Sequence, residues 1–238
     1  MAIQTRVVEY SVDGTVFEGY LAWDDAVSET RPGVLVSHTI RGRTPFEEAK
    51  ARDLAELGYV ALALDVYGKD QIGHEERGRT NMDALKADRP GLQARLKTAL
   101  DTLALQPEVD SECLGAIGFC FGGLCVLDLV RIEAPVRGVA SFHGLFDPPG
   151  NTDGNQSSAA VLALHGWDDP LAKPASVVAL GQELTELGCD WQIHAYGHTM
   201  HAFTNPAADD AERGTVYAEA ANRRSWYAMT SFFTEIFG

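Results

Sequence analysis

The sequence has few cysteines, little positive charge and no long apolar run, and each shortage argues against a class of protein. Its four cysteines form neither a CxxC pair nor the spacing of a zinc site, so we expect free thiols and no metal. Lysine and arginine number 19 against 34 acidic residues, and a formal charge of −15 disfavours nucleic-acid or anionic-membrane partners. No apolar segment approaches the roughly 20 residues that cross a bilayer.

The overall composition fits a globular protein of ordinary size. Hydrophobic residues make up 45% of the chain and charged residues 22%, which excludes a disordered or fibrous class. A length of 238 residues suits one α/β domain spanning 1–238. The first residues, MAIQTRVVEYSVDG, alternate as a strand does and lack the basic and apolar regions of a signal peptide. We therefore expect a cytoplasmic protein, either a monomer or a weak homodimer.

The hydrophobic pattern predicts a mostly parallel central sheet with helices on both faces and an antiparallel N-terminal hairpin. Alternating segments at 3–12 and 16–23 flank Asp13-Gly14, a pair typical of tight hairpin turns. Continuously apolar strands then alternate with helical segments, as in a sheet that is buried on both faces. We expect these strands at 34–37, 60–64, 114–117, 136–141, 160–164 and 191–195, and helices at 45–57, 82–105 with a disturbance near Pro90, 124–132, 175–187 and 210–236.

The segment Gly118-Phe119-Cys120-Phe121-Gly122-Gly123 joins an apolar strand to a helix. This is the form of a nucleophile elbow, with cysteine in the place of serine in G-x-S-x-G. An elbow strains the backbone at its nucleophile and presses the residues two positions away together, so those residues must be small. The following helix N-terminus favours a thiolate. A buried cysteine between packing glycines is the structural alternative, but the strand and helix on either side favour a nucleophile at Cys120.

A carboxylate and a histidine follow Cys120 in the order typical of α/β-hydrolases. The segment His165-Gly166-Trp167-Asp168-Asp169 comes after an apolar strand, and the G-x-x-D spacing selects Asp169 over Asp168 as the acid. After the next strand, His201 is favoured as the base by its H-x-F context, and His198 remains the competitor. The other histidines near strand ends are scattered and indicate no metal site.

These motifs resemble the dienelactone hydrolase family, through GFCFGG at 118–123, HGxxD at 165–169 and HAF at 201–203. The resemblance runs from about Val34 to the C-terminus. It implies an α/β-hydrolase fold with a Cys-His-Asp triad and no cofactor. Carried over by position, Cys120 is the nucleophile, His201 the base and Asp169 its partner. The backbone N–H groups of Ile40 and Phe121 then form the oxyanion hole.

Two departures from the family pattern bear on the substrate. The family string E-I-x-G reads Thr39-Ile40-Arg41-Gly42 here, and the family arginine four residues after the histidine is Asn205. We count Thr39, Arg41, Asn205 and the neighbouring His38 as candidate substrate contacts. Arg77 and Arg79 are further candidates for a substrate anion.

The expected reaction is cleavage of activated esters, such as enol lactones and aryl esters, through a thioester at Cys120. With less charge committed to a substrate carboxylate, the pocket is also expected to admit aryl phosphotriesters. The alternative from another class is a redox- or electrophile-sensing thiol on a retained hydrolase fold.

Overall fold

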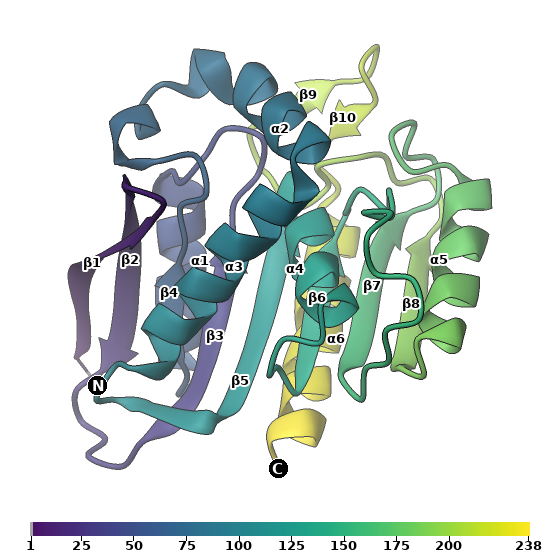
Figure 1. The fold of residues 1–238 in the computed structure, drawn as a ribbon. Helices are drawn as coiled ribbons and strands as arrows, with labels where there is room; N and C mark the ends of the chain where they lie inside the picture. The colour runs from purple at the N-terminus through teal and green to yellow at the C-terminus, as the bar shows by residue number, and fades with distance from the viewer. Residues whose placement is uncertain (1) are drawn as a thin grey trace.

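The computed structural model describes residues 2–238 and is built around a twisted eight-stranded sheet (Figure 1). The strands are β1 (Ile3–Val12), β2 (Thr15–Asp24), β3 (Arg31–Ser37), β4 (Val60–Ala63), β5 (Val109–Phe119), β6 (Gly138–Phe142), β7 (Ala160–Gly166) and β8 (Asp190–Tyr196). They lie in the order β1-β2-β4-β3-β5-β6-β7-β8. Strands β3 to β8 are parallel, while β1 and β2 run antiparallel at one edge.

The predicted N-terminal hairpin is confirmed. Its strands pair from Ile3 opposite Asp24 to Val12 opposite Thr15, which leaves a two-residue turn. Both turn residues have positive φ, 50° at Asp13 and 80° at Gly14. A turn of this kind matches the twist of the strands that it joins.

Helices cover both faces of the sheet, as the sequence predicts. They are α1 (Pro45–Glu56), α2 (Gly78–Ala87), α3 (Arg89–Ala104), α4 (Phe121–Arg131), α5 (Pro174–Glu186) and α6 (Glu219–Phe237). Buried residues of α3, α4 and α5 belong to one hydrophobic cluster, and those of α1 and α6 belong to the other (Figure 1). Within β3, Leu35 joins the first cluster while Val34 and Val36 join the second. Alternate side chains of this strand therefore serve opposite faces.

Two predicted helices differ from the structure. The helix expected at 82–105 is two helices, because Asp88 caps a new helix that begins at Arg89. The Asp88 side chain accepts the Gly91 N–H at 3.1 Å, and Pro90 lies in the first turn. The helix expected at 210–236 begins only at Glu219. The preceding residues form a small hairpin of β9 (Asp209–Asp210) and β10 (Thr215–Val216).

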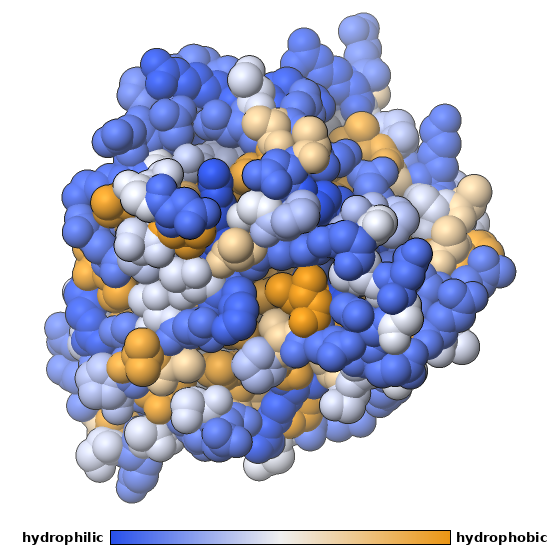
Figure 2. Space-filling model, in the orientation of Figure 1, coloured by the Kyte–Doolittle hydropathy of each residue, from blue (hydrophilic) through white to orange (hydrophobic). Residues whose placement is uncertain are grey.

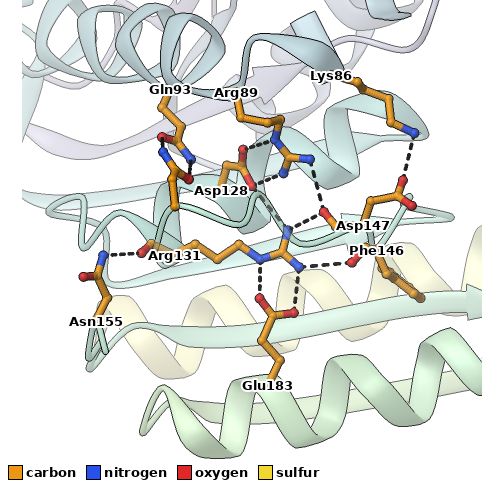
Figure 3. Close-up of polar contacts among 10 residues, drawn as sticks. Lys86, Arg89, Gln93, Asp128, Arg131, Phe146, Asp147, Asn155 and Glu183 are labelled. Carbon is orange, nitrogen blue, oxygen red and sulfur yellow. Dashed lines mark hydrogen bonds and ion pairs between the residues drawn. The ribbon is translucent and has the colours of Figure 1, made fainter. Parts of the chain in front are cut away.

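A buried ionic network ties three helices to the long loop after β6 (Figure 3). On α4, Asp128 and Arg131 are fully buried, and Arg89 donates two hydrogen bonds to Asp128. Arg131 donates to both carboxylate oxygens of Glu183 on α5, at 2.7 and 2.8 Å, and to the Phe146 carbonyl at 3.1 Å. Since buried charges are costly unless paired, this network fixes the loop relative to α3, α4 and α5.

Hydrophilic residues cover most of the face seen in Figure 2, and apolar residues there form small separate groups. Scattered apolar groups of this size are ordinary on a protein surface. Among residues 2–238, none of the helices has the length and apolar character needed to span a membrane.

Candidate active site

Cys120 stands at the turn between the end of β5 and the start of α4, in a backbone conformation that non-glycine residues rarely adopt. Its φ is 57° and its ψ is −115°. The neighbours explain the glycines, because a Cβ at Gly118 would lie 2.0 Å from the Gly122 carbonyl oxygen. A Cβ at Gly122 would lie 2.2 Å from the Ser37 carbonyl oxygen. The sequence therefore builds the sharp strand–turn–helix corner that the motif predicts.

Asp169 and His201 meet beside this corner. Asp169 follows β7 and His201 follows β8, and His201 Nδ1 donates to Asp169 Oδ2 at 2.7 Å. Both residues are about 2% exposed, so the bond is shielded from water. The other ring nitrogen, Nε2, is buried without a hydrogen-bond partner among residues 2–238. His201 and the thiol of Cys120 interact closely enough that each shifts the pKa of the other.

These shifts favour a thiolate–imidazolium pair. Burial opposes ionisation of Cys120, but the positive charge of His201 and nearby N–H groups outweigh it and place the thiol pKa below its usual value. Burial likewise opposes a charge on His201. The facing thiolate and the bond to Asp169 nevertheless raise the pKa of His201 to about 10. The geometry therefore favours an ionised nucleophile, with the proton held on the imidazole beside it.

Two backbone N–H groups lower the pKa of the Cys120 thiol, those of Phe121 at the start of α4 and Ile40 after β3. Both stabilise the thiolate, and they come from separate parts of the chain. Donors in this arrangement can also hold the oxyanion of a tetrahedral intermediate. The structure thus brings together the two N–H groups and the three side chains that the sequence singled out.

The small hairpin β9–β10 holds the backbone of His201, and the sequence did not predict this hairpin. The His201 N–H donates to the Gly214 carbonyl at 2.9 Å, and the Val216 N–H donates to the His201 carbonyl at 3.0 Å. A bridge also pairs His201 with Thr215. The segment expected to be helical is therefore what fixes His201 in place.

His143, after β6, forms a wall of the site that the sequence did not assign. It lies edge-on to His201 with ring centres 5.0 Å apart, and its Nε2 bonds Thr204 Oγ1 at 2.8 Å. Burial and the charge of His201 hold the pKa of His143 well below its usual value. A neutral ring here packs against the imidazole without competing for its proton.

The structure places the four candidate substrate contacts in different settings. Arg41 is exposed and pairs with Glu75 at 3.3 Å, while Asn205 Oδ1 accepts the Ala207 N–H at 3.0 Å. Thr39 Oγ1 accepts the Arg41 N–H at 3.3 Å. His38 is fully buried, and backbone groups engage both of its ring nitrogens, which leaves neither free for a substrate.

Glu47 and Tyr67 adjoin the oxyanion loop, and sequence reasoning missed both. Glu47 is fully buried and accepts the Thr39 N–H at 3.1 Å. It also forms a capping box with Thr44, a pattern readable as T-x-x-E at the start of α1. The Tyr67 hydroxyl donates to the Ile40 carbonyl at 3.1 Å, a contact that no local pattern reveals.

Comparisons with known proteins identify the family of this chain. The profile of the dienelactone hydrolase family matches residues 17–237. A solved structure named m3DLH is 38% identical with a TM-score of 0.92, and the dienelactone hydrolase-like promiscuous phosphotriesterase P91 from metagenomic libraries is 37% identical with a TM-score of 0.91. Both matches cover all of each chain. A putative carboxymethylenebutenolidase of Synechocystis sp. is 27% identical over 97% of this chain and 96% of its own. The chain therefore belongs to the dienelactone hydrolase family and is a carboxylic ester hydrolase.

Proposed function

We propose that this enzyme hydrolyses activated carboxylic esters and lactones through a covalent thioester on Cys120. The observation that carries the proposal is the juxtaposition of Cys120 with the His201–Asp169 pair and with two N–H groups at one elbow. This constellation supplies a nucleophile, a proton carrier and an oxyanion hole, the three parts that acyl transfer needs.

The proposed mechanism has two halves. The Cys120 thiolate attacks the carbonyl carbon, and the Ile40 and Phe121 N–H groups bind the resulting oxyanion. The intermediate collapses with cleavage of the ester C–O bond, and the leaving oxygen takes the proton of His201. The imidazole then removes a proton from water as that water attacks the thioester. Collapse of the second intermediate expels the thiolate, which regenerates the ion pair with the proton on His201.

The chemistry of the nucleophile selects the substrate class. A thiolate leaves a tetrahedral intermediate more readily than an alkoxide or an amide nitrogen does, so forward reaction needs a leaving group that is itself stable as an anion. Enol lactones and aryl esters meet this condition, while peptides do not. The name of the putative carboxymethylenebutenolidase relative refers to a butenolide, an unsaturated lactone, which is consistent with an enol lactone substrate.

Aryl phosphotriesters form the second proposed class, because a similar structure is named a promiscuous phosphotriesterase. Attack by Cys120 on phosphorus would expel the aryloxide and leave a phosphorus–sulfur bond. Water activated by His201 can break that bond more easily than the phosphorus–oxygen bond of a phosphoserine. The same N–H pair would hold the phosphoryl oxygen. Repeated turnover of an aryl dialkyl phosphate supports this activity, whereas a single burst that leaves Cys120 phosphorylated excludes it.

A sensing thiol is the competing proposal, since an ionised cysteine oxidises readily. A sensor of the disulfide type also needs a second reactive thiol, and Cys125, the next cysteine along the chain, is fully buried on α4. Burial raises the pKa of the Cys125 thiol and makes it a poor nucleophile.

We further propose that residues 1–238 act as one domain in the cytoplasm, as a monomer or weak homodimer.

Stopped-flow hydrolysis of an aryl ester separates these proposals. A hydrolase releases the aryl alcohol in a burst equal to the enzyme concentration and then turns over steadily. Cys120→Ala is expected to abolish both phases while it retains the wild-type fold, because it removes one sulfur at a turn. A sensor would react once, without a steady phase.

A further inference from the structure

His38 is a buried histidine with an unusual pair of partners. It lies directly after β3, fully buried, and precedes Thr39 and Ile40 of the oxyanion loop. The Val66 N–H donates to His38 Nε2 at 3.3 Å, so that nitrogen carries no hydrogen. The hydrogen of the neutral ring is therefore on Nδ1, which donates to the Thr39 carbonyl oxygen at 2.7 Å. Two backbone groups thus fix both the tautomer and the orientation of the ring.

The carbonyl that accepts this bond belongs to the peptide group that carries the Ile40 N–H. A peptide group is planar and trans, so its C=O and N–H point in opposite directions. Fixing the direction of the Thr39 oxygen therefore fixes the direction of the Ile40 hydrogen. That N–H is one of the two that favour the Cys120 thiolate.

The peptide groups on either side are fixed as well. Glu47 Oε1 accepts the Thr39 N–H at 3.1 Å from one side. On the other side, the Tyr67 hydroxyl donates to the Ile40 carbonyl at 3.1 Å. The start of α2 packs on the same carbonyl so tightly that a Cβ at Gly78 would lie 2.2 Å from its oxygen. The loop is thus held by groups from β3, α1, α2 and the segment after β4.

We propose that His38 is a positioning residue that orients the Ile40 N–H of the oxyanion hole, with Glu47 and Tyr67 holding the adjacent peptide groups. This inference rests on the proposed function, in which that N–H stabilises the tetrahedral intermediates. A donor fixed before the reaction needs no reorganisation when the oxyanion forms. Loss of the bond lets the peptide rotate and reduces transition-state stabilisation while substrate binding is largely retained.

Two amide substitutions separate this role from simple core packing. In His38→Asn the side-chain NH₂ can take the place of Nδ1 and donate to the Thr39 carbonyl, but Val66 loses its acceptor. In His38→Gln the longer side chain can offer its oxygen to Val66 in the place of Nε2, but the donor to Thr39 is lost. Both variants remove the ring, which lies edge-on to Tyr67 at 4.6 Å. A purely structural role predicts equal effects of the two.

We expect kcat for an aryl ester to fall roughly 10- to 100-fold in His38→Gln with KM within about threefold, since removing a whole oxyanion donor costs about 100- to 1000-fold. The kcat of His38→Asn is expected to stay within about fivefold of wild type. The two variants should have similar melting temperatures. The midpoint for alkylation of Cys120 against pH should rise only in His38→Gln. Equal kcat losses in the two variants, or an unchanged kcat in His38→Gln, would overturn the proposal.

Two controls keep the result decisive. Cys120→Ala must be inactive, and if it turns over substrate, the nucleophile assignment fails. If Cys120→Ala is inactive but the two His38 variants lose kcat equally, only the role of His38 is overturned. If neither His38 variant folds, Tyr67→Phe provides the test, because it releases the Ile40 carbonyl and gives up only a longer contact of 3.5 Å to the Gly78 carbonyl. A three- to tenfold loss in kcat at constant KM supports the proposal, and unchanged kcat refutes it.

Discussion

Two Asp–His pairs lie side by side in this protein, and they differ mainly in burial. Asp169 and His201 are buried and bonded at 2.7 Å, whereas Asp168 and His198 are exposed and 3.9 Å apart. The His198 side chain is fully exposed and that of Asp168 is 46% exposed. Both pairs join the loop after β7 to the loop after β8. The same residue types on the same loops therefore make one shielded pair and one solvated pair.

Backbone geometry produces the difference. The Asp168 N–H donates to the Thr199 carbonyl at 3.0 Å, and this bond ties the two loops together while the Asp168 side chain points outward. Asp169, one residue later, turns inward, and its Oδ1 accepts the Leu171 N–H at 2.8 Å. In water an ion pair contributes little, while in a shielded site the same pair strongly changes the pKa of its histidine. Burial, more than residue type, decides which pair can support catalysis.

Replacing the histidines gives the largest contrast. We expect His201→Ala to lower kcat/KM for an aryl ester by at least about 1000-fold, because it removes the proton carrier and the charge that stabilises the thiolate. His198→Ala should change it by less than about threefold. Steady-state kinetics on the two folded variants measures both effects. A greater loss in His198→Ala would mean that the wrong histidine is assigned as the base.

The ionic network around α4 allows buried and partly exposed ion pairs to be compared for their effect on stability. Asp128→Ala leaves Arg89 and Arg131 buried without their shared partner, and we expect it to lower the free energy of unfolding by about 3–5 kcal/mol. Lys86→Ala breaks only a partly exposed pair with Asp147 and should cost under about 1 kcal/mol. Urea titration of both variants gives the comparison. Similar losses would show that burial does not set the strength of these pairs.

The aspartates should show a smaller contrast than the histidines. Asp169→Asn keeps the side-chain shape but removes the charge that supports the imidazolium, so we expect kcat/KM to fall roughly 10- to 100-fold. A thiol depends less on its base than a serine does, which keeps this loss below that of His201→Ala. Asp168→Asn should remain within about threefold of wild type. The reverse order would move the acid one residue earlier.

The smallest effect concerns the ionisation of the thiol. In the folded enzyme the pKa of Cys120 lies below the usual pKa of a thiol. Its thiolate should therefore persist as the pH falls through that usual pKa, and disappear only when the pH nears the lowered pKa. Burial, the first cause in each case, raises the pKa of Cys113, Cys125 and Cys189. Iodoacetamide at neutral pH should therefore label Cys120 first, as peptide mass spectrometry can measure. His201→Ala should move the midpoint upwards, and an unmoved midpoint would contradict the ion pair.

Local patterns were sufficient to predict most of the strands, the helices on both faces of the sheet and the elbow at Cys120. Each of these depends on residues that are close in sequence, such as the glycines on either side of the elbow. The hairpin of β9 and β10 could not be predicted, because its purpose is a tertiary contact with the His201 backbone. The role of His38 was also out of reach. Thr39 is its neighbour in the chain, but Val66 reaches the ring only after β3 and β4 pair in the sheet.

A covalent thioester on Cys120 can be detected by mass spectrometry of the enzyme quenched in acid during steady turnover of an aryl ester. We expect the peptide containing Cys120 to gain the mass of the acyl group, and this adduct to decay at the turnover rate once substrate is exhausted. The adduct should be absent from Cys120→Ala. Steady turnover without an acyl group on Cys120, or turnover by Cys120→Ala above about a hundredth of wild type, would rule out the thioester mechanism.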